Sequence, residues 1–67
     1  MLYHCILLLK GEEQFHTFYS KHEAIAKADE LYDQNPGAYV SVEDSDGELL
    51  YEKGDFTSNK PTSESGF

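Results

Sequence analysis

The segment Leu2–Lys10 constrains the fold of this chain more than any other feature, because it is apolar on both faces of a strand. Successive side chains of a strand point to opposite sides, which gives one face of His4, Ile6 and Leu8 and another of Tyr3, Cys5, Leu7 and Leu9. A strand that is apolar on both sides is typical of the interior of a sheet. We therefore expect Leu2–Lys10 to be a central strand.

Two turn signals place three further strands around it. Gly11 can adopt the positive φ of a hairpin turn, so we expect a second strand over Gln14–Tyr19, which is rich in aromatic residues. The Asp-Gly pair at 46–47 is the stronger turn signal. It predicts a third strand over Ala38–Glu43, with its valines facing inward, and a fourth strand over Glu48–Lys53.

A helix is predicted between the two hairpins. Ser20 and Glu23 form a capping box, in which each side chain can bond to the backbone amide of the other. The helix is expected from Lys21 to about Gln34, where apolar residues recur at helical spacing: Ala24, Ile25, Ala28, Leu31 and Tyr32. The Asn-Pro-Gly triplet at 35–37 ends it, because proline disfavours helical geometry in the residue before it.

These elements predict an α+β fold of order ββαββ. A four-stranded antiparallel sheet of order 2-1-3-4 carries the helix on one face. We expect a single domain over residues 1–56 and a disordered C-terminal tail over residues 57–67, where polar residues predominate. One helix leaves the other face of the sheet uncovered. A homodimer through that face would remove the exposure, and a monomer that tolerates it is the alternative.

Composition narrows the class of function. Thirteen Asp and Glu against five Lys and no Arg give a formal net charge of −8 on 67 residues. Such acidity disfavours direct binding to nucleic acid or to anionic membranes, since both require Lys and Arg. It favours high solubility or a basic protein as the partner.

The expected compartment is the cytoplasm. Cys5 is the single cysteine and cannot form an internal disulfide, which fits a reducing compartment better than a secreted scaffold. The longest apolar run, Cys5–Leu9, is too short to span a bilayer. The N-terminal residues lack the basic region of a signal peptide.

Carboxylates concentrated on the second hairpin form the main candidate binding site. Six of them lie within thirteen residues: Glu43, Asp44, Asp46, Glu48, Glu52 and Asp55. The first turn and the helix add four more to the expected surface: Glu12, Glu13, Glu30 and Asp33. Alternate residues of a strand lie about 6.6 Å apart, and rows of carboxylates at such spacing can stand in for DNA phosphates. The alternative is a solvated acidic face that only keeps a small protein soluble.

Catalysis and metal binding are disfavoured by missing motifs. A calcium loop around the Asp-Gly turn would need ligands where the chain has Val42 and Lys53. Zinc-ligand spacing is absent among the possible donors His4, Cys5, His16 and His22. No catalytic motif or phosphate-binding loop is present. We therefore expect no enzymatic activity, no metal and no other cofactor.

The small size, acidity and mixed α/β pattern resemble the host-takeover proteins encoded by phages. Two kinds are similar: DNA mimics, which occupy DNA-binding surfaces of restriction enzymes, histone-like nucleoid proteins or repair enzymes, and small inhibitors of host RNA polymerase. Small bacterial ββαββ domains are also similar in the pattern Phe18-x-Ser20-x-x-Glu23-Ala24-Ile25-x-x-Ala28. These resemblances cover residues 2–56 in pattern and transfer no functional residues.

Acidity and resemblance together favour a non-enzymatic inhibitor. We expect a DNA mimic that occupies the DNA-binding surface of a basic DNA-binding protein in the host cytoplasm, such as a nucleoid protein or a defence nuclease. The alternative is an inhibitor or adaptor that binds an enzyme such as RNA polymerase without imitating DNA. Aromatic residues beside the acidic hairpin would suit a protein interface: Tyr39, Tyr51 and Phe56.

Overall fold

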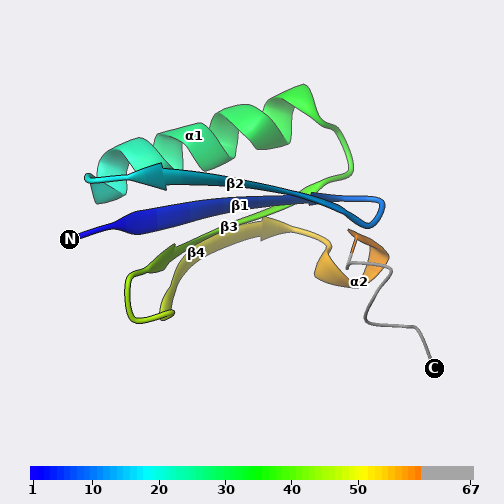
Figure 1. The fold of residues 1–67 in the computed structure, drawn as a ribbon. Helices are drawn as coiled ribbons and strands as arrows, with labels where there is room; N and C mark the ends of the chain where they lie inside the picture. The colour runs from blue at the N-terminus through cyan, green and yellow to red at the C-terminus, as the bar shows by residue number, and fades with distance from the viewer. Residues whose placement is uncertain (60–67) are drawn as a thin grey trace.

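The computed structural model describes residues 1–59 and confirms the predicted α+β fold (Figure 1). The elements are β1 (Tyr3–Leu9), β2 (Glu12–Phe18), α1 (Lys21–Gln34), β3 (Tyr39–Asp44), β4 (Leu49–Gly54) and a short helix α2 (Phe56–Asn59). The four strands form one sheet of order β2-β1-β3-β4, in which each neighbouring pair is antiparallel. The central position of β1 agrees with its two apolar faces.

A two-residue turn closes the first hairpin. Lys10 has a φ of 51° and Gly11 a φ of 87°, as a type I′ turn requires at both central positions. Leu9 pairs with Glu12 directly across the turn. The strand β2 therefore begins at Glu12 and not at Gln14, because the tight turn leaves its two glutamates in the edge strand, where charged residues are common.

The second hairpin contains a β-bulge. Val42 pairs with Tyr51, but Glu43 pairs with Leu49, so Leu50 is an extra residue on β4. Both strands of this hairpin begin and end one residue later than the sequence predicted. The hydrophobic alternation of the third strand is confirmed, since its valines face the core.

The hydrophobic core lies between α1 and one face of the sheet (Figure 1). The helix begins as predicted, with the Glu23 amide donating to the Ser20 hydroxyl oxygen at 3.4 Å. The fully or nearly fully buried core residues come from the helix, from the central strands and from the residue just before β3: Cys5, Leu7, Ala24, Ala28, Leu31, Ala38, Val40 and Val42. The predicted apolar stripe of the helix therefore faces the sheet.

The side of the sheet away from α1, which we call the open face, is defined by the strand register. Residues that pair across neighbouring strands share a face, which places eleven residues here: His4, Ile6, Leu8, Glu13, Phe15, Thr17, Tyr39, Ser41, Glu43, Leu49 and Glu52. The helix α2 lies at one end of this face, where the Phe56 ring meets the Tyr39 ring edge-on at a centroid distance of 5.4 Å. Figure 1 shows α2 beside the β1–β2 turn, on the opposite side of the sheet from α1.

The chain remains folded beyond the predicted domain boundary at residue 56. Residues 57–59, which we expected in the tail, belong to α2. Asn59 is 2% exposed, accepts a hydrogen bond from the Lys10 amide at 3.1 Å and donates to the carbonyl oxygens of Gly37 and Asp55 at 2.8 Å. The rest of the predicted tail, residues 60–67, lies outside the described residues. No helix within residues 1–59 has the length and apolar character needed to cross a membrane.

Candidate binding surface

Asp44 builds the β3–β4 turn. Its Oδ1 atom accepts hydrogen bonds from the backbone amides of Asp46 and Glu48, each at 2.9 Å. Its backbone carbonyl accepts from the Gly47 amide at 3.0 Å, and the residue is only 9% exposed. Asp44 therefore fixes the shape of the turn and presents little of its carboxylate to a partner, although the sequence placed it among the binding residues.

Three other carboxylates gather at this turn, and we call them the turn cluster: Glu43, Asp46 and Glu48. Asp46 and Glu48 are exposed, and Glu43 is half-buried on the open face. The two ion pairs described within residues 1–59 both use carboxylates of α1. The turn cluster is therefore a set of outward carboxylates without a lysine partner in the described part of the chain.

Glu52 and Asp55 are separated from the turn cluster and engaged within the chain. The Tyr39 hydroxyl donates to a Glu52 carboxylate oxygen at 2.8 Å. Asp55 accepts from the Ser58 hydroxyl at 2.8 Å and from the Thr57 amide at 3.0 Å, and these bonds cap α2. The hydrogen bond from the Ser58 hydroxyl is the main reason that the pKa of Asp55 lies below its usual value. Both residues remain exposed.

Glu12 and Glu13 lie at the other end of the sheet from the turn cluster. Tyr3, at the start of β1, pairs with Asp44, whereas Leu9, at its end, pairs with Glu12. A strand rises about 3.4 Å per residue, so the two ends are about 20 Å apart. Figure 1 shows the two hairpin turns at opposite ends of the molecule. Glu12 and Glu13 thus form one acidic end of the sheet and the turn cluster forms the other.

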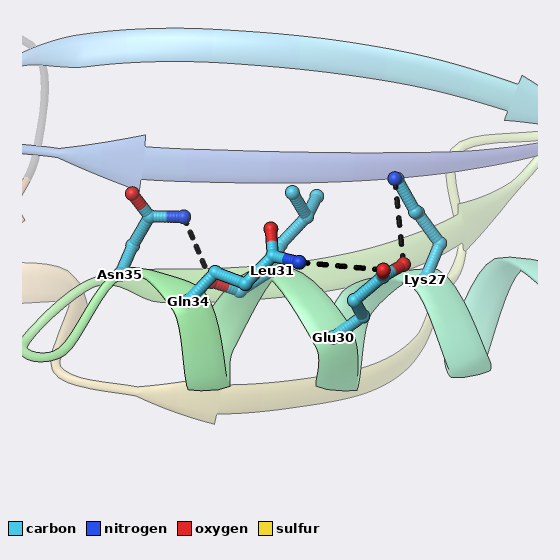
Figure 2. A network of polar contacts seen from close by, with 5 residues as sticks. All are labelled: Lys27, Glu30, Leu31, Gln34 and Asn35. Atoms are coloured by element: carbon cyan, nitrogen blue, oxygen red, sulfur yellow. Dashed lines mark hydrogen bonds and ion pairs between the residues drawn. The ribbon is translucent and has the colours of Figure 1, made fainter.

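The two predicted helix residues differ in their contacts. Figure 2 shows Lys27 and Gln34 reaching the Glu30 carboxylate from either side along α1. Lys27 Nζ lies 3.4 Å from one oxygen of Glu30, and Gln34 Nε2 donates to the other at 3.3 Å. Asp33 is exposed and has no described side-chain contact within residues 1–59. Of the two, Glu30 is therefore engaged by neighbours on the helix, whereas Asp33 has no described ion pair within residues 1–59.

Apolar side chains of the open face were not named as a site from the sequence, apart from Tyr39 and Phe56. Phe15 is 64% exposed, Leu49 is 49% exposed and Phe56 is 45% exposed. The signal was present, because Phe15 occupies an alternate position in a strand that pairs with β1 and lies opposite Ile6. This apolar surface was missed because the alternation of side chains along the strands does not show which face of the sheet the helix leaves uncovered.

The potential nucleophile and metal donors do not assemble into a site within residues 1–59. No cavity and no group of three or more possible metal ligands occurs in this part of the chain. Cys5 is completely buried in the core, and burial raises the pKa of its thiol. A buried, protonated thiol is a poor nucleophile and a poor ligand.

Comparisons with known proteins identify no relative of this chain. No family model, curated protein or solved structure matches this chain. The resemblance to phage host-takeover proteins therefore stays a prediction. The charge and geometry of the surface are the grounds on which a function can be assigned.

Proposed function

We propose that this protein is a non-enzymatic inhibitor that occupies the DNA-binding surface of a basic host DNA-binding protein. The observation that carries the proposal is the turn cluster, which the fold holds outward without a lysine partner within residues 1–59. A formal net charge of −8 would steer the protein toward a cationic surface. Carboxylates would accept the Lys and Arg donors that otherwise contact phosphates.

The arrangement of the acidic ends supports imitation of a duplex. They lie about 20 Å apart, which corresponds to about six base steps at 3.4 Å per step. A partner whose basic groups contact phosphates on both sides of a groove could therefore meet one acidic end with each group. The Asp44 bonds hold the β3–β4 turn in shape, so little ordering is needed when the partner binds.

The second candidate is an inhibitor or adaptor that binds an enzyme such as RNA polymerase without imitating DNA. The exposed apolar side chains of Phe15 and Leu49 favour it, since aromatic and apolar anchors dominate many protein interfaces. The two candidates differ in their response to salt. A charge-based interface weakens steeply as salt rises, whereas an apolar interface does not.

Elution by DNA tests the proposal. The full chain is immobilised, loaded with bacterial lysate and washed, and the retained proteins are eluted first with duplex DNA and then with high salt. We expect duplex DNA to release basic DNA-binding proteins. A matched column carries the triple variant Glu43→Gln, Asp46→Asn and Glu48→Gln, which should retain far less of the same proteins.

Two outcomes would overturn the proposal. Retained proteins that resist duplex DNA and leave only under denaturing conditions would favour the apolar candidate. Equal retention on the wild-type and triple-variant columns would show that the turn cluster does not carry binding. Circular dichroism of the triple variant serves as the folding control, because exposed substitutions change stability by only about 0.5 kcal/mol each.

A further inference from the structure

The open face carries an apolar pair, Ile6 and Phe15, that the described part of the chain leaves partly uncovered. Phe15 of β2 lies directly opposite Ile6 of β1, whereas Leu49 of β4 lies at the opposite edge of the same face, beyond Ser41 and Glu43 of β3. Phe15 is 64% exposed and Leu49 is 49% exposed. The helix α2 reaches only one end of the face, where Phe56 packs on Tyr39. Exposed apolar side chains on a sheet face that no long helix covers offer contacts to a partner.

Three carboxylates lie around the pair of Ile6 and Phe15 and form its border. Glu13 lies on β2, Glu43 on β3 and Glu52 on β4, all on the open face by register. Both ion pairs described within residues 1–59 involve carboxylates of α1, which packs on the other side of the sheet. The border is therefore negative, and no lysine of the described residues forms an ion pair with it.

This charge pattern decides between two occupants. A second copy of the chain would bring one carboxylate border against another, and like charges across an interface are unfavourable. A partner element with an apolar stripe flanked by Lys and Arg would instead match both the apolar pair and the border. Its apolar residues would cover Ile6 and Phe15, and its cations would pair with Glu13 and Glu43.

The shape of the face favours a helix as that element. Layered folds bury a sheet face by packing a helix on it, as α1 does on the other side (Figure 1). A helix with its side chains is about 10–12 Å wide, and strands are about 4.8 Å apart, so one helix covers about two to three strands. We infer that the open face binds an amphipathic basic helix of the partner protein. This inference rests on the proposed function, because it takes the partner to be a basic protein.

The test uses two synthetic peptides and the full chain. Both peptides have the length of α1, 14 residues, and are built only of Leu and Lys in the same proportion. In one, the leucines recur at helical spacing and form a stripe; in the other, the order is shuffled so that no stripe forms. We expect the striped peptide to bind at least about tenfold more tightly by fluorescence anisotropy, a difference of about 1.4 kcal/mol. Amide shifts of the isotope-labelled protein should change at Ile6, Glu13 and Phe15.

Matched variants locate the site. Glu13→Gln with Glu43→Gln removes two charges from the border, whereas Glu23→Gln with Asp29→Asn removes two charges from the helix side, at positions outside the candidate binding surface. We expect the first pair to weaken the striped peptide about tenfold and the second pair to change its affinity less than about twofold. Phe15→Ser should also weaken binding, and amide spectra of each variant confirm that the fold is retained.

Three results would overturn the inference: equal affinity for both peptides, shift changes confined to α1, or a concentration-dependent homodimer in which the open face is the interface. The proposed function fails by a separate observation, the resistance of captured proteins to elution by duplex DNA. If duplex DNA releases the captured proteins but both peptides bind equally, the inferred helix-binding site is wrong and the proposed function still stands.

Discussion

The two faces of the sheet are made by the same strands and differ in what covers them. Under α1, the side chains of Cys5, Val40 and Val42 are completely buried. On the open face, Phe15 is 64% exposed and Leu49 is 49% exposed. Burial of apolar surface stabilises a fold only where water is removed. Leu8 and Tyr39 also lie on the open face but are only 4% and 8% exposed, so the part of this face that is available for binding is the part around Ile6, Phe15 and Leu49.

The carboxylates differ between the two sides in the same way. On the side of α1, Asp29 accepts from the Tyr51 hydroxyl and lies 3.9 Å from Lys53 Nζ. On the open face, Glu43 has no described ion pair within residues 1–59, and Glu13 is exposed. Negative charge is partly neutralised where the chain packs on itself and remains uncompensated where a partner could bind.

Truncation of neighbouring residues in β1 gives the largest expected contrast. Leu7 is 2% exposed on the covered face, so Leu7→Ala should lower the free energy of unfolding by about 2–5 kcal/mol through lost burial and a cavity. Ile6→Ala, on the open face, should cost less than about 1.5 kcal/mol, because water already reaches that side chain. Urea denaturation of both variants measures the difference.

Equal losses in the two variants would contradict this contrast. They would mean that the Ile6 side chain is shielded from water in solution. A second copy of the chain packed on the open face is the simplest explanation. Sedimentation at micromolar concentration would then report a mass of twice 7.6 kDa. A monomer with a small Ile6→Ala effect would support an open face that is free for a partner.

The sequence predicted the fold well because most of its determinants are local. The capping box and apolar stripe gave the helix its observed bounds, Lys21–Gln34. The two turn signals fixed the hairpins, and the two apolar faces of Leu2–Lys10 placed that strand in the interior. Strand order needed one further assumption, that the third strand pairs with the first, and the sheet confirms it.

Features that depend on distant contacts could not be read from local patterns. The helix α2 is held by Asn59, which bonds to Lys10 and Gly37. These partners are distant in the sequence, and no local pattern around residue 59 predicts the contacts. The extra residue Leu50 on β4 arises from the register between strands. For the candidate site, the sequence predicted which acidic residues lie on the second hairpin but not which of them are free to bind a partner. It could not show that the Asp44 carboxylate would accept hydrogen bonds from the backbone of its own turn.

Asn59→Ala is expected to have the next largest effect, and it tests how far the chain covers its own open face. The change removes one acceptor and two donated bonds, leaving the Lys10 amide and the Gly37 carbonyl without these partners. A cost of about 1–3 kcal/mol in the free energy of unfolding is typical of such a loss. Amide hydrogen exchange should accelerate at Lys10 and throughout α2, with little change in α1. Unchanged exchange at Lys10 would mean that α2 is not an anchored part of the domain.

A matched pair of tyrosine–carboxylate contacts gives a smaller contrast between the faces. Tyr51 donates to Asp29 on the covered side, and Tyr39 donates to Glu52 on the open face. The bond to Asp29 is the main cause that raises the pKa of Tyr51, whereas burial is the main cause for Tyr39, with the Glu52 bond second. Asp29→Asn should therefore lower the pKa of Tyr51 clearly, and Glu52→Gln should lower the pKa of Tyr39 by less. The pKa values are measured by following tyrosinate absorbance in the ultraviolet as the pH is raised. Variants in which Tyr39 or Tyr51 is replaced by phenylalanine assign each pKa to its tyrosine.

The sign of the linked stability change follows from these raised pKa values. A tyrosine that holds its proton more tightly in the folded state contributes stability fully below the pKa of the unfolded chain, about 10. That contribution is lost as the pH rises through the folded-state pKa. Stability should therefore fall in alkaline solution, and Tyr51→Phe should reduce the fall. An alkaline profile unchanged by Tyr51→Phe and by Tyr39→Phe would rule out both contacts as its source.

Acid should produce the smallest effect, confined to the end of the open face that α2 covers. The pKa of Asp55 is lowered chiefly by the Ser58 hydroxyl bond, so its contribution to stability is complete above the unfolded pKa and is lost as the pH falls through the folded value. Amide shifts of Thr57 and Ser58 should move together below about pH 4, while the core under α1 stays unchanged. Asp55→Asn should remove this titration and loosen α2 already at neutral pH. The Phe56 ring packs edge-on against the Tyr39 ring. A change in the amide shift of Tyr39 together with that of Ser58 would therefore show that α2 moves as a unit. An unchanged Tyr39 shift would limit the acid effect to the bonds between Asp55 and the start of α2.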